Sequence, residues 1–117
     1  MKITKSSTPE ELEPLCMAVH ELTNGMPVTG RSKERNGLRI ENGKVIDRDY
    51  TGPVLEEVLD KGEIIRKVPA AGVYKGIPVV VVPLKEGGET IAAIGVVDVT
   101  YGIYSEANII GRRRPAR

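Results

Sequence analysis

The chain of 117 residues has no tryptophan and no phenylalanine, one cysteine and one histidine. A single cysteine excludes a disulfide within the chain, and cysteine and histidine together are too few to form a zinc cage. Four tyrosines are the only aromatic side chains, whereas proteins that bind single-stranded nucleic acid stack bases on several aromatic platforms. These absences argue against a structural metal and against recognition of single strands.

The chain has no long apolar run either. Its longest, residues 77–84, includes two prolines and is far shorter than the roughly 20 residues that a membrane-spanning helix needs. No apolar stretch follows the basic start, so we expect no signal peptide and a cytoplasmic protein. The length fits a single domain, residues 1–117, with a folded core of residues 8–110.

Charge is unevenly distributed along the chain. The formal net charge is +1, but four arginines lie within the last six residues. The rest of the chain is therefore mildly acidic, which is not typical of a nucleic-acid-binding domain. We interpret residues 111–117 as a basic, flexible tail.

Two helices are predicted from their end signals and from the spacing of apolar residues. The first covers residues 9–24, because Thr8 and Glu11 form a capping box and apolar side chains recur on one face. The second begins after Thr51-Gly52-Pro53 and ends at Lys61-Gly62. This second helix is short enough to need tertiary packing for its stability.

Two hairpins are also predicted. Asn42-Gly43 separates two short alternating runs and is the dipeptide that a type I′ turn favours. Two valine-rich runs flank a second loop, residues 85–89, and their continuous apolar character is typical of strands covered on both faces. We interpret residues 25–36 as a loop and residues 104–110 as a turn or two of helix. The five predicted strands are residues 38–41, 44–47, 63–68, 77–84 and 90–100.

The predicted order of elements is therefore α-β-β-α-β-β-β. An α+β fold with one five-stranded antiparallel sheet and helices packed on it satisfies the preference of consecutive strands to lie side by side.

Two segments carry a resemblance to known proteins. Residues 75–84, KGIPVVVVPL, and residues 90–98, TIAAIGVVD, resemble the last hairpin of profilin-like sensor domains of the PAS, GAF and Cache types. The element order is similar to these sensors and to roadblock and longin scaffolds. The chain as a whole also resembles an uncharacterised, mostly archaeal family of domains of unknown function. The resemblance transfers no catalytic residue, and Cys16 and His20 lie outside the positions that hold flavin or haem in such sensors, so we expect no cofactor.

The start of the second helix is the strongest candidate for a binding site. Its free N–H groups, preceded by Tyr50, Thr51 and Gly52, suit an anion. With Arg48 they would form an anion pocket, and Cache-type sensors hold carboxylates in such a place. The alternative is simple helix capping, with Arg48 paired to a neighbouring aspartate. Tyr74 lies among small residues and either lines a pocket or covers the sheet.

Cys16 and His20 are four residues apart and are neighbours on the first helix. Either the imidazole activates the thiolate, or the pair is a core cysteine beside a partly exposed histidine. The chain has no phosphate loop, dinucleotide fingerprint, metalloprotease helix or nucleophile elbow. We therefore expect no enzyme, no catalytic residue and no metal site.

The sequence thus favours a small sensor or ligand-binding domain for a small metabolite, with an anion as one option. It would act as a homodimer whose contacts include the first helix and an exposed face of the sheet. The alternative is a roadblock-like interaction scaffold that binds a protein partner and no ligand. We expect no association with membranes, and the charge distribution disfavours nucleic acid.

Overall fold

The computed structural model describes residues 1–98, which form two helices and one sheet of six strands. The observed order is α-β-β-β-α-β-β-β, so the prediction of five strands in the order α-β-β-α-β-β-β was wrong. The elements are α1 (Pro9–Leu22), β1 (Val28–Ser32), β2 (Gly37–Glu41), β3 (Lys44–Tyr50), α2 (Pro53–Lys61), β4 (Ile65–Lys67), β5 (Val79–Glu86) and β6 (Glu89–Val97).

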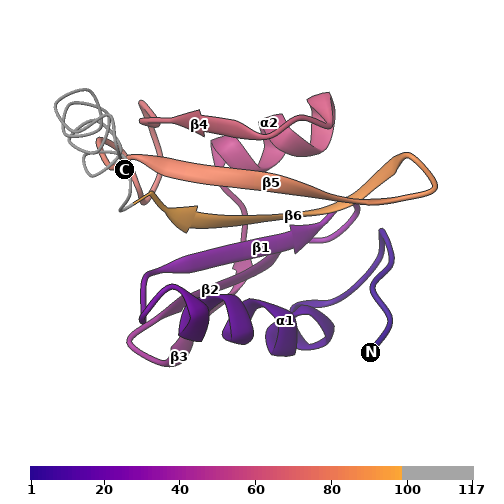
Figure 1. The fold of residues 1–117 in the computed structure, drawn as a ribbon, viewed down its shortest axis with the longest axis horizontal. Helices are drawn as coiled ribbons and strands as arrows, with labels where there is room; N and C mark the ends of the chain where they lie inside the picture. The colour runs from indigo at the N-terminus through magenta and orange to yellow at the C-terminus, as the bar shows by residue number, and fades with distance from the viewer. Residues whose placement is uncertain (99–117) are drawn as a thin grey trace, which may run out of the picture.

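The strands lie in the order β3-β2-β1-β6-β5-β4, and every neighbouring pair is antiparallel. Figure 1 shows the sheet as two three-stranded halves that meet where β1 lies beside β6. The two valine-rich runs pair with each other as β5 and β6, as predicted. The expected helical turn at residues 104–110 and the basic tail lie outside the described residues.

The missed element is β1, which lies inside the segment interpreted as a loop. Its sequence, VTGRS, combines a glycine with a charge, and such a composition normally marks a loop. The structure shows why glycine is needed: a methyl group at Gly30 would lie 2.7 Å from Cys16 Sγ on α1. A methyl group at Gly37 on β2 would overlap the backbone of Gly30. The glycines of this central strand pair permit close packing and do not break the strand.

Both helices and both hairpins form as their local signals predicted. The side chain of Thr8 accepts a hydrogen bond from Glu11 N–H, and the Glu11 carboxylate accepts one from Thr8 N–H. Gly62 ends α2 in the left-handed conformation, with φ of 68°. Asn42 and Gly43 both have positive φ at the β2–β3 turn, as a type I′ turn requires.

The two faces of the sheet carry separate cores because side chains alternate along each strand. On one face, Leu12 and Cys16 of α1 pack with Val28, Leu38 and Ile40. On the other face, α2 packs against β5 and β6 through a second cluster. None of the helices within residues 1–98 is long and apolar enough to cross a membrane. The second face, under α2, is where the sheet is hollowed.

Candidate functional site

A pocket of about 410 Å³, part of it open to solvent, lies between α2, the sheet and the loop of residues 68–78. Its lining is mainly apolar and carries no charged side chain. The lining residues are Pro27, Thr29, Tyr50, Gly52, Pro53, Val54, Leu55, Pro69, Ala71, Val73, Tyr74, Val79, Val81, Gly95, Val96 and Val97. This apolar character suits the body of a small organic molecule.

The floor of the pocket follows from strand register. Thr29 on β1 lies opposite Gly95 on β6, and Gly95 lies opposite Val81 on β5. A methyl group at Gly95 would lie 2.8 Å from Val81 Cγ2 and 3.1 Å from Thr29 Oγ1. Glycine at this position therefore lets Val81 and Thr29 approach each other closely at the floor of the pocket.

Two hydroxyl groups are the notable polar features of the lining. Thr29 is 8% exposed and Tyr50 is 7% exposed. Neither hydroxyl has a hydrogen-bond partner within residues 1–98, although both residues line the pocket. Burial raises the pKa of the Tyr50 hydroxyl above its usual value, so it is a neutral donor at physiological pH.

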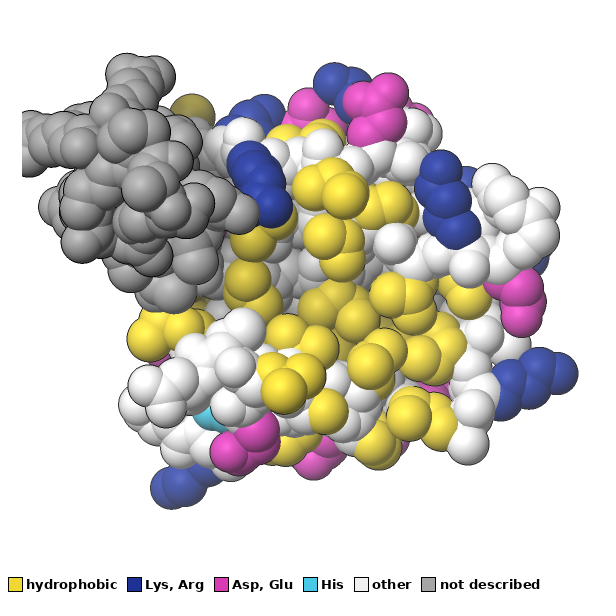
Figure 2. Space-filling view, viewed as in Figure 1, with side chains coloured by type: hydrophobic (Ala, Val, Ile, Leu, Met, Phe, Trp, Pro, Cys, Tyr) yellow, Lys and Arg dark blue, Asp and Glu magenta, His cyan; other side chains and the backbone are white. Residues whose placement is uncertain are grey.

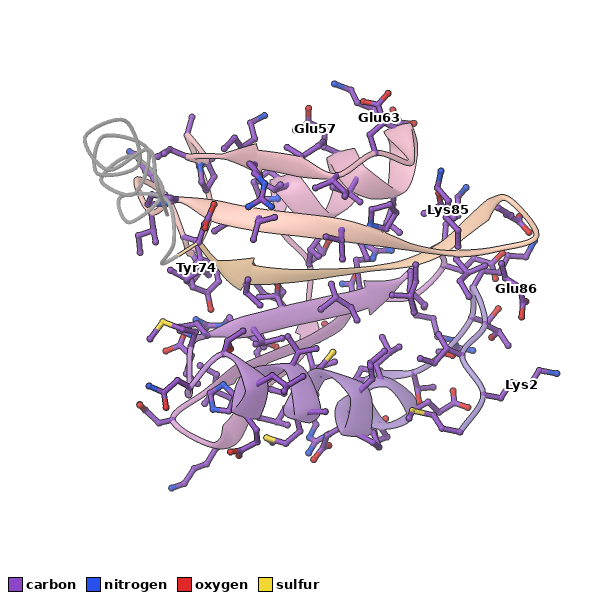
Figure 3. All side chains as sticks on the ribbon, viewed as in Figure 1. Lys2, Glu57, Glu63, Tyr74, Lys85 and Glu86 are labelled. Atoms are coloured by element: carbon purple, nitrogen blue, oxygen red, sulfur yellow. The ribbon has the colours of Figure 1, made fainter. Side chains whose placement is uncertain are left out.

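Tyr74 closes one side of the pocket from the loop between β4 and β5. Its hydroxyl donates a hydrogen bond of 2.9 Å to Glu41 Oε2, and burial followed by this hydrogen bond raises the pKa of Tyr74. Glu41 in turn accepts a hydrogen bond of 3.2 Å from Arg39 Nη1. Figure 3 shows Tyr74 at the end of the sheet opposite the β5–β6 turn, which Lys85 and Glu86 mark.

The structure brings three of the five predicted site residues together: Tyr50, Gly52 and Tyr74 all line the pocket. Thr51 lies beside it, where its hydroxyl accepts from Arg31 and donates to Glu56. Arg48 reaches α1 and pairs with Glu10 and Glu13 at 3.3 and 2.8 Å. It therefore does not contribute to the pocket, and it pairs with neither neighbouring aspartate. The hydrogen bond to Glu13 raises the pKa of the Arg48 guanidinium.

Cys16 and His20 do not form a reactive pair. His20 Nδ1 lies 2.6 Å from the Met26 carbonyl oxygen, and the Gly43 N–H donates to Nε2 at 2.9 Å. Both ring nitrogens are thus used: Nδ1 contacts the segment that follows α1, and Nε2 ties α1 to the β2–β3 turn. Within the described part of the chain, no group of three histidine, cysteine or acidic side chains is placed to hold a metal ion.

Thr29 and Arg39 are the residues near the pocket that the sequence did not point to. They are opposite each other on β1 and β2. The signal for Arg39 was present, because it alternates with Leu38 and Ile40 and must face the other side of the sheet. Thr29 gave no such signal, since its strand was interpreted as a loop.

Comparison with known proteins places this chain in a family. The family described as "Uncharacterized protein conserved in archaea (DUF2111)" matches residues 19–100, and the chain belongs to it. "Uncharacterized protein MJ0405" of Methanocaldococcus jannaschii is 46% identical over 111 residues, which make up 95% of this chain and 85% of that protein. No solved structure matches the chain significantly. The resemblance to an archaeal family is thus confirmed, and the likeness to PAS, GAF and profilin-like sensors finds no support in these comparisons.

Proposed function

We propose that this protein binds a small molecule in the pocket between α2 and the sheet. The observation that carries the proposal is the pair of hydroxyls of Thr29 and Tyr50, two largely buried residues whose hydroxyls have no protein partner within residues 1–98 and which line an otherwise apolar pocket. Buried polar groups in native proteins are normally hydrogen-bonded, because an unmet hydroxyl costs about 1–3 kcal/mol. A ligand with a polar group would supply the missing partners.

The lining favours a ligand with an apolar body. Valine, proline and tyrosine side chains make up most of the wall, and Gly95 lies at the floor. Such pockets bind through apolar burial and take their specificity from a few polar groups. A scaffold without a ligand, the competing proposal, would fill this space with side chains.

We further propose that the protein acts as a homodimer through the face opposite the pocket. Helix α1 covers β1 and β2 on that face, and the core beneath it extends to Ile94 of β6. Among residues 1–98, no helix covers the outer half of the sheet, β4 and β5, on this face. Figure 2 shows an apolar surface that continues from this half to α1. It includes Val82, which is 36% exposed, and Leu22, which is 84% exposed. In a two-fold dimer, α1 of each copy would lie on the open half of the sheet of the other copy.

In this proposal the ligand and the dimer are coupled through β5. Val79 and Val81 line the pocket, whereas Val80 and Val82 alternate with them and face the uncovered half. A ligand that shifts β5 would change the dimer surface. It can shift the equilibrium between two dimer conformations only by the difference in its affinity for them.

A thermal-shift screen against a metabolite panel tests the ligand proposal. A ligand present at a hundred times its Kd stabilises the folded state by about 2.7 kcal/mol, so a true ligand raises the melting temperature by several degrees. Thr29→Val keeps the shape and removes the hydroxyl, and we expect it to weaken binding about three- to tenfold. Tyr50→Phe should act in the same direction.

Thr51→Val is the matched control, because Thr51 lies beside the pocket without lining it and its hydroxyl already has partners. This variant should be less stable but keep the full ligand-induced shift. A panel that leaves the melting temperature unchanged would favour the scaffold. Equal ligand shifts in the wild type and Thr29→Val would contradict the role given to the hydroxyl.

A further inference from the structure

Arg39 lies beside the pocket, next to residues that line it, but is not itself part of the lining. It is the β2 partner of Thr29 in the register, so the two side chains lie on the same face of the sheet. Its guanidinium carbon is 5.8 Å from the centre of the Tyr50 ring, and its Nη1 donates to Glu41, which also accepts from Tyr74. Arg39 is thus surrounded by three of the residues that line the pocket.

One donor of this arginine is unused. Arg39 Nε is the only buried side-chain nitrogen or oxygen within residues 1–98 that has no hydrogen-bond partner. A charged donor left without an acceptor is among the costlier defects in a protein interior. Thr29 is its register partner and the Tyr50 ring centre lies 5.8 Å from its guanidinium carbon, so Arg39 is next to both pocket residues whose hydroxyls have no partner within residues 1–98.

No neighbouring carboxylate accepts a hydrogen bond from Arg39 Nε–H. Glu41 is already shared by Arg39 and Tyr74, and Asp47 on β3 lies opposite Arg39 in the register without a hydrogen bond or ion pair to it. Arg31, the other arginine on this side, donates to Ser32, Lys33, Asn36 and Thr51. Arg39 therefore combines a permanent positive charge with an N–H that has no acceptor within residues 1–98.

We infer that the ligand of this pocket is a monocarboxylic acid, with its carboxylate at Arg39 Nε–H and the hydroxyls of Thr29 and Tyr50. Its apolar body would lie over Gly95 and Val81. This inference rests on the proposed function, and it adds the chemical class of the ligand and the residue that selects it. Arg39 has five N–H groups, so it can hold a ligand carboxylate and keep its contact with Glu41.

Paired probes test the inference. We would titrate hexanoate against hexanamide, and benzoate against benzamide, because each pair differs in charge and hardly in shape. The acid of each pair should bind at least tenfold more tightly than its amide. In proton–nitrogen spectra the acid should shift the Nε–H signal of Arg39, assigned by its loss in Arg39→Lys, and the amide should shift it much less.

Substitutions provide the second readout. Arg39→Met should remove the preference for the acid and leave amide binding within about twofold. Glu41→Gln removes the competing carboxylate and should strengthen acid binding several-fold. Arg48→Met is the matched control, because this arginine pairs with α1 and lies away from the pocket; its preference for the acid should equal that of the wild type.

The outcomes separate the two proposals. If both members of each pair shift the signals of Thr29 and Tyr50 equally, the carboxylate inference is wrong and the proposed function stands. The same follows if the acid preference survives in Arg39→Met. If neither member of either pair perturbs the residues of the pocket, both proposals fail.

Discussion

At the scale of single residues, Cys16 shows how burial alone sets the chemistry of a side chain. It is completely buried between α1 and β1, and this burial raises the pKa of its thiol from about 9 to about 12. Because the thiolate is the reactive form, we predict that the native protein hardly reacts with an aromatic disulfide reagent at about pH 8. The same protein in denaturant should react within minutes, as measured by the absorbance of the released thiolate.

The same shift predicts how Cys16 affects stability at high pH. The folded state holds the thiol proton more tightly than the unfolded state does. The stabilisation is therefore complete below about pH 9 and decreases as the pH rises toward about 12, by up to roughly 1.4 kcal/mol per pH unit. Urea unfolding of Cys16→Ala should lack this contribution and lose stability less steeply. Rapid reaction of the native thiol, or equal slopes for both proteins, would contradict the assignment.

The two arginines near the site show what the sequence could and could not reveal. Arg48 is close along the chain to the start of α2, but its side chain reaches α1 at the edge of the sheet. Arg39 is distant along the chain and lies beside Tyr50 in the fold. Strand alternation assigns a face to Arg39, but only the pairing of β2 with β1 brings it to Thr29. Tyr50, Gly52 and Tyr74 could be predicted from the sequence, because the local features that selected them, the start of a helix and a tyrosine among small residues, also lie at the pocket in the fold.

At the scale of elements, the loop of residues 68–78 forms one wall of the pocket. Its backbone hydrogen bonds are largely internal, as between Gly76 N–H and the Pro69 carbonyl at 3.0 Å. Tyr74 supplies the side-chain hydrogen bond that links the loop to Glu41 on β2. We predict that Tyr74→Phe accelerates amide exchange in residues 70–77 by about fivefold, the equivalent of one hydrogen bond of roughly 1 kcal/mol. Mass-resolved hydrogen exchange would measure it.

Amides of β5 and β6 are the internal reference for this experiment, since they belong to the paired centre of the sheet. Glu41→Gln keeps a weaker acceptor at the same place and should give an intermediate increase. Unchanged exchange in the loop of Tyr74→Phe would show that apolar contacts alone hold it. A uniform increase across the sheet would indicate general destabilisation.

Elements with strong local signals were predictable, and β1 was not. The capping box of α1 and the Asn42-Gly43 turn depend on groups a few residues apart, so the sequence contains the whole interaction. β1 depends on partners far along the chain, because it lies between β2 and β6 and beneath α1. Its Gly30 is typical of a loop in isolation, and only the approach of Cys16 explains it as part of a strand.

At the scale of the whole molecule, the sheet separates two surfaces with different characters. The pocket lies on the α2 face, whereas the uncovered apolar half lies on the face of α1, where Figure 2 shows it. Apolar surface of this extent on a small protein commonly marks an interface. The two surfaces share β5, whose alternating valines contact one or the other. In the proposed dimer, a ligand in the pocket would therefore affect association through β5 without touching the interface.

The homodimer proposal makes a prediction about mass in solution. We expect light scattering at micromolar concentration to give the mass of two chains, because a stable interface needs about 800 Å² from each partner and the open half with α1 is the largest apolar area in view. Val82→Glu places a charge on this half and should yield a monomer. Ile46→Glu is the matched control, since Ile46 is 46% exposed on β3 outside the open half, and it should leave the dimer intact. A wild-type monomer, or a dimer that survives Val82→Glu, would show that this face is not where two copies meet.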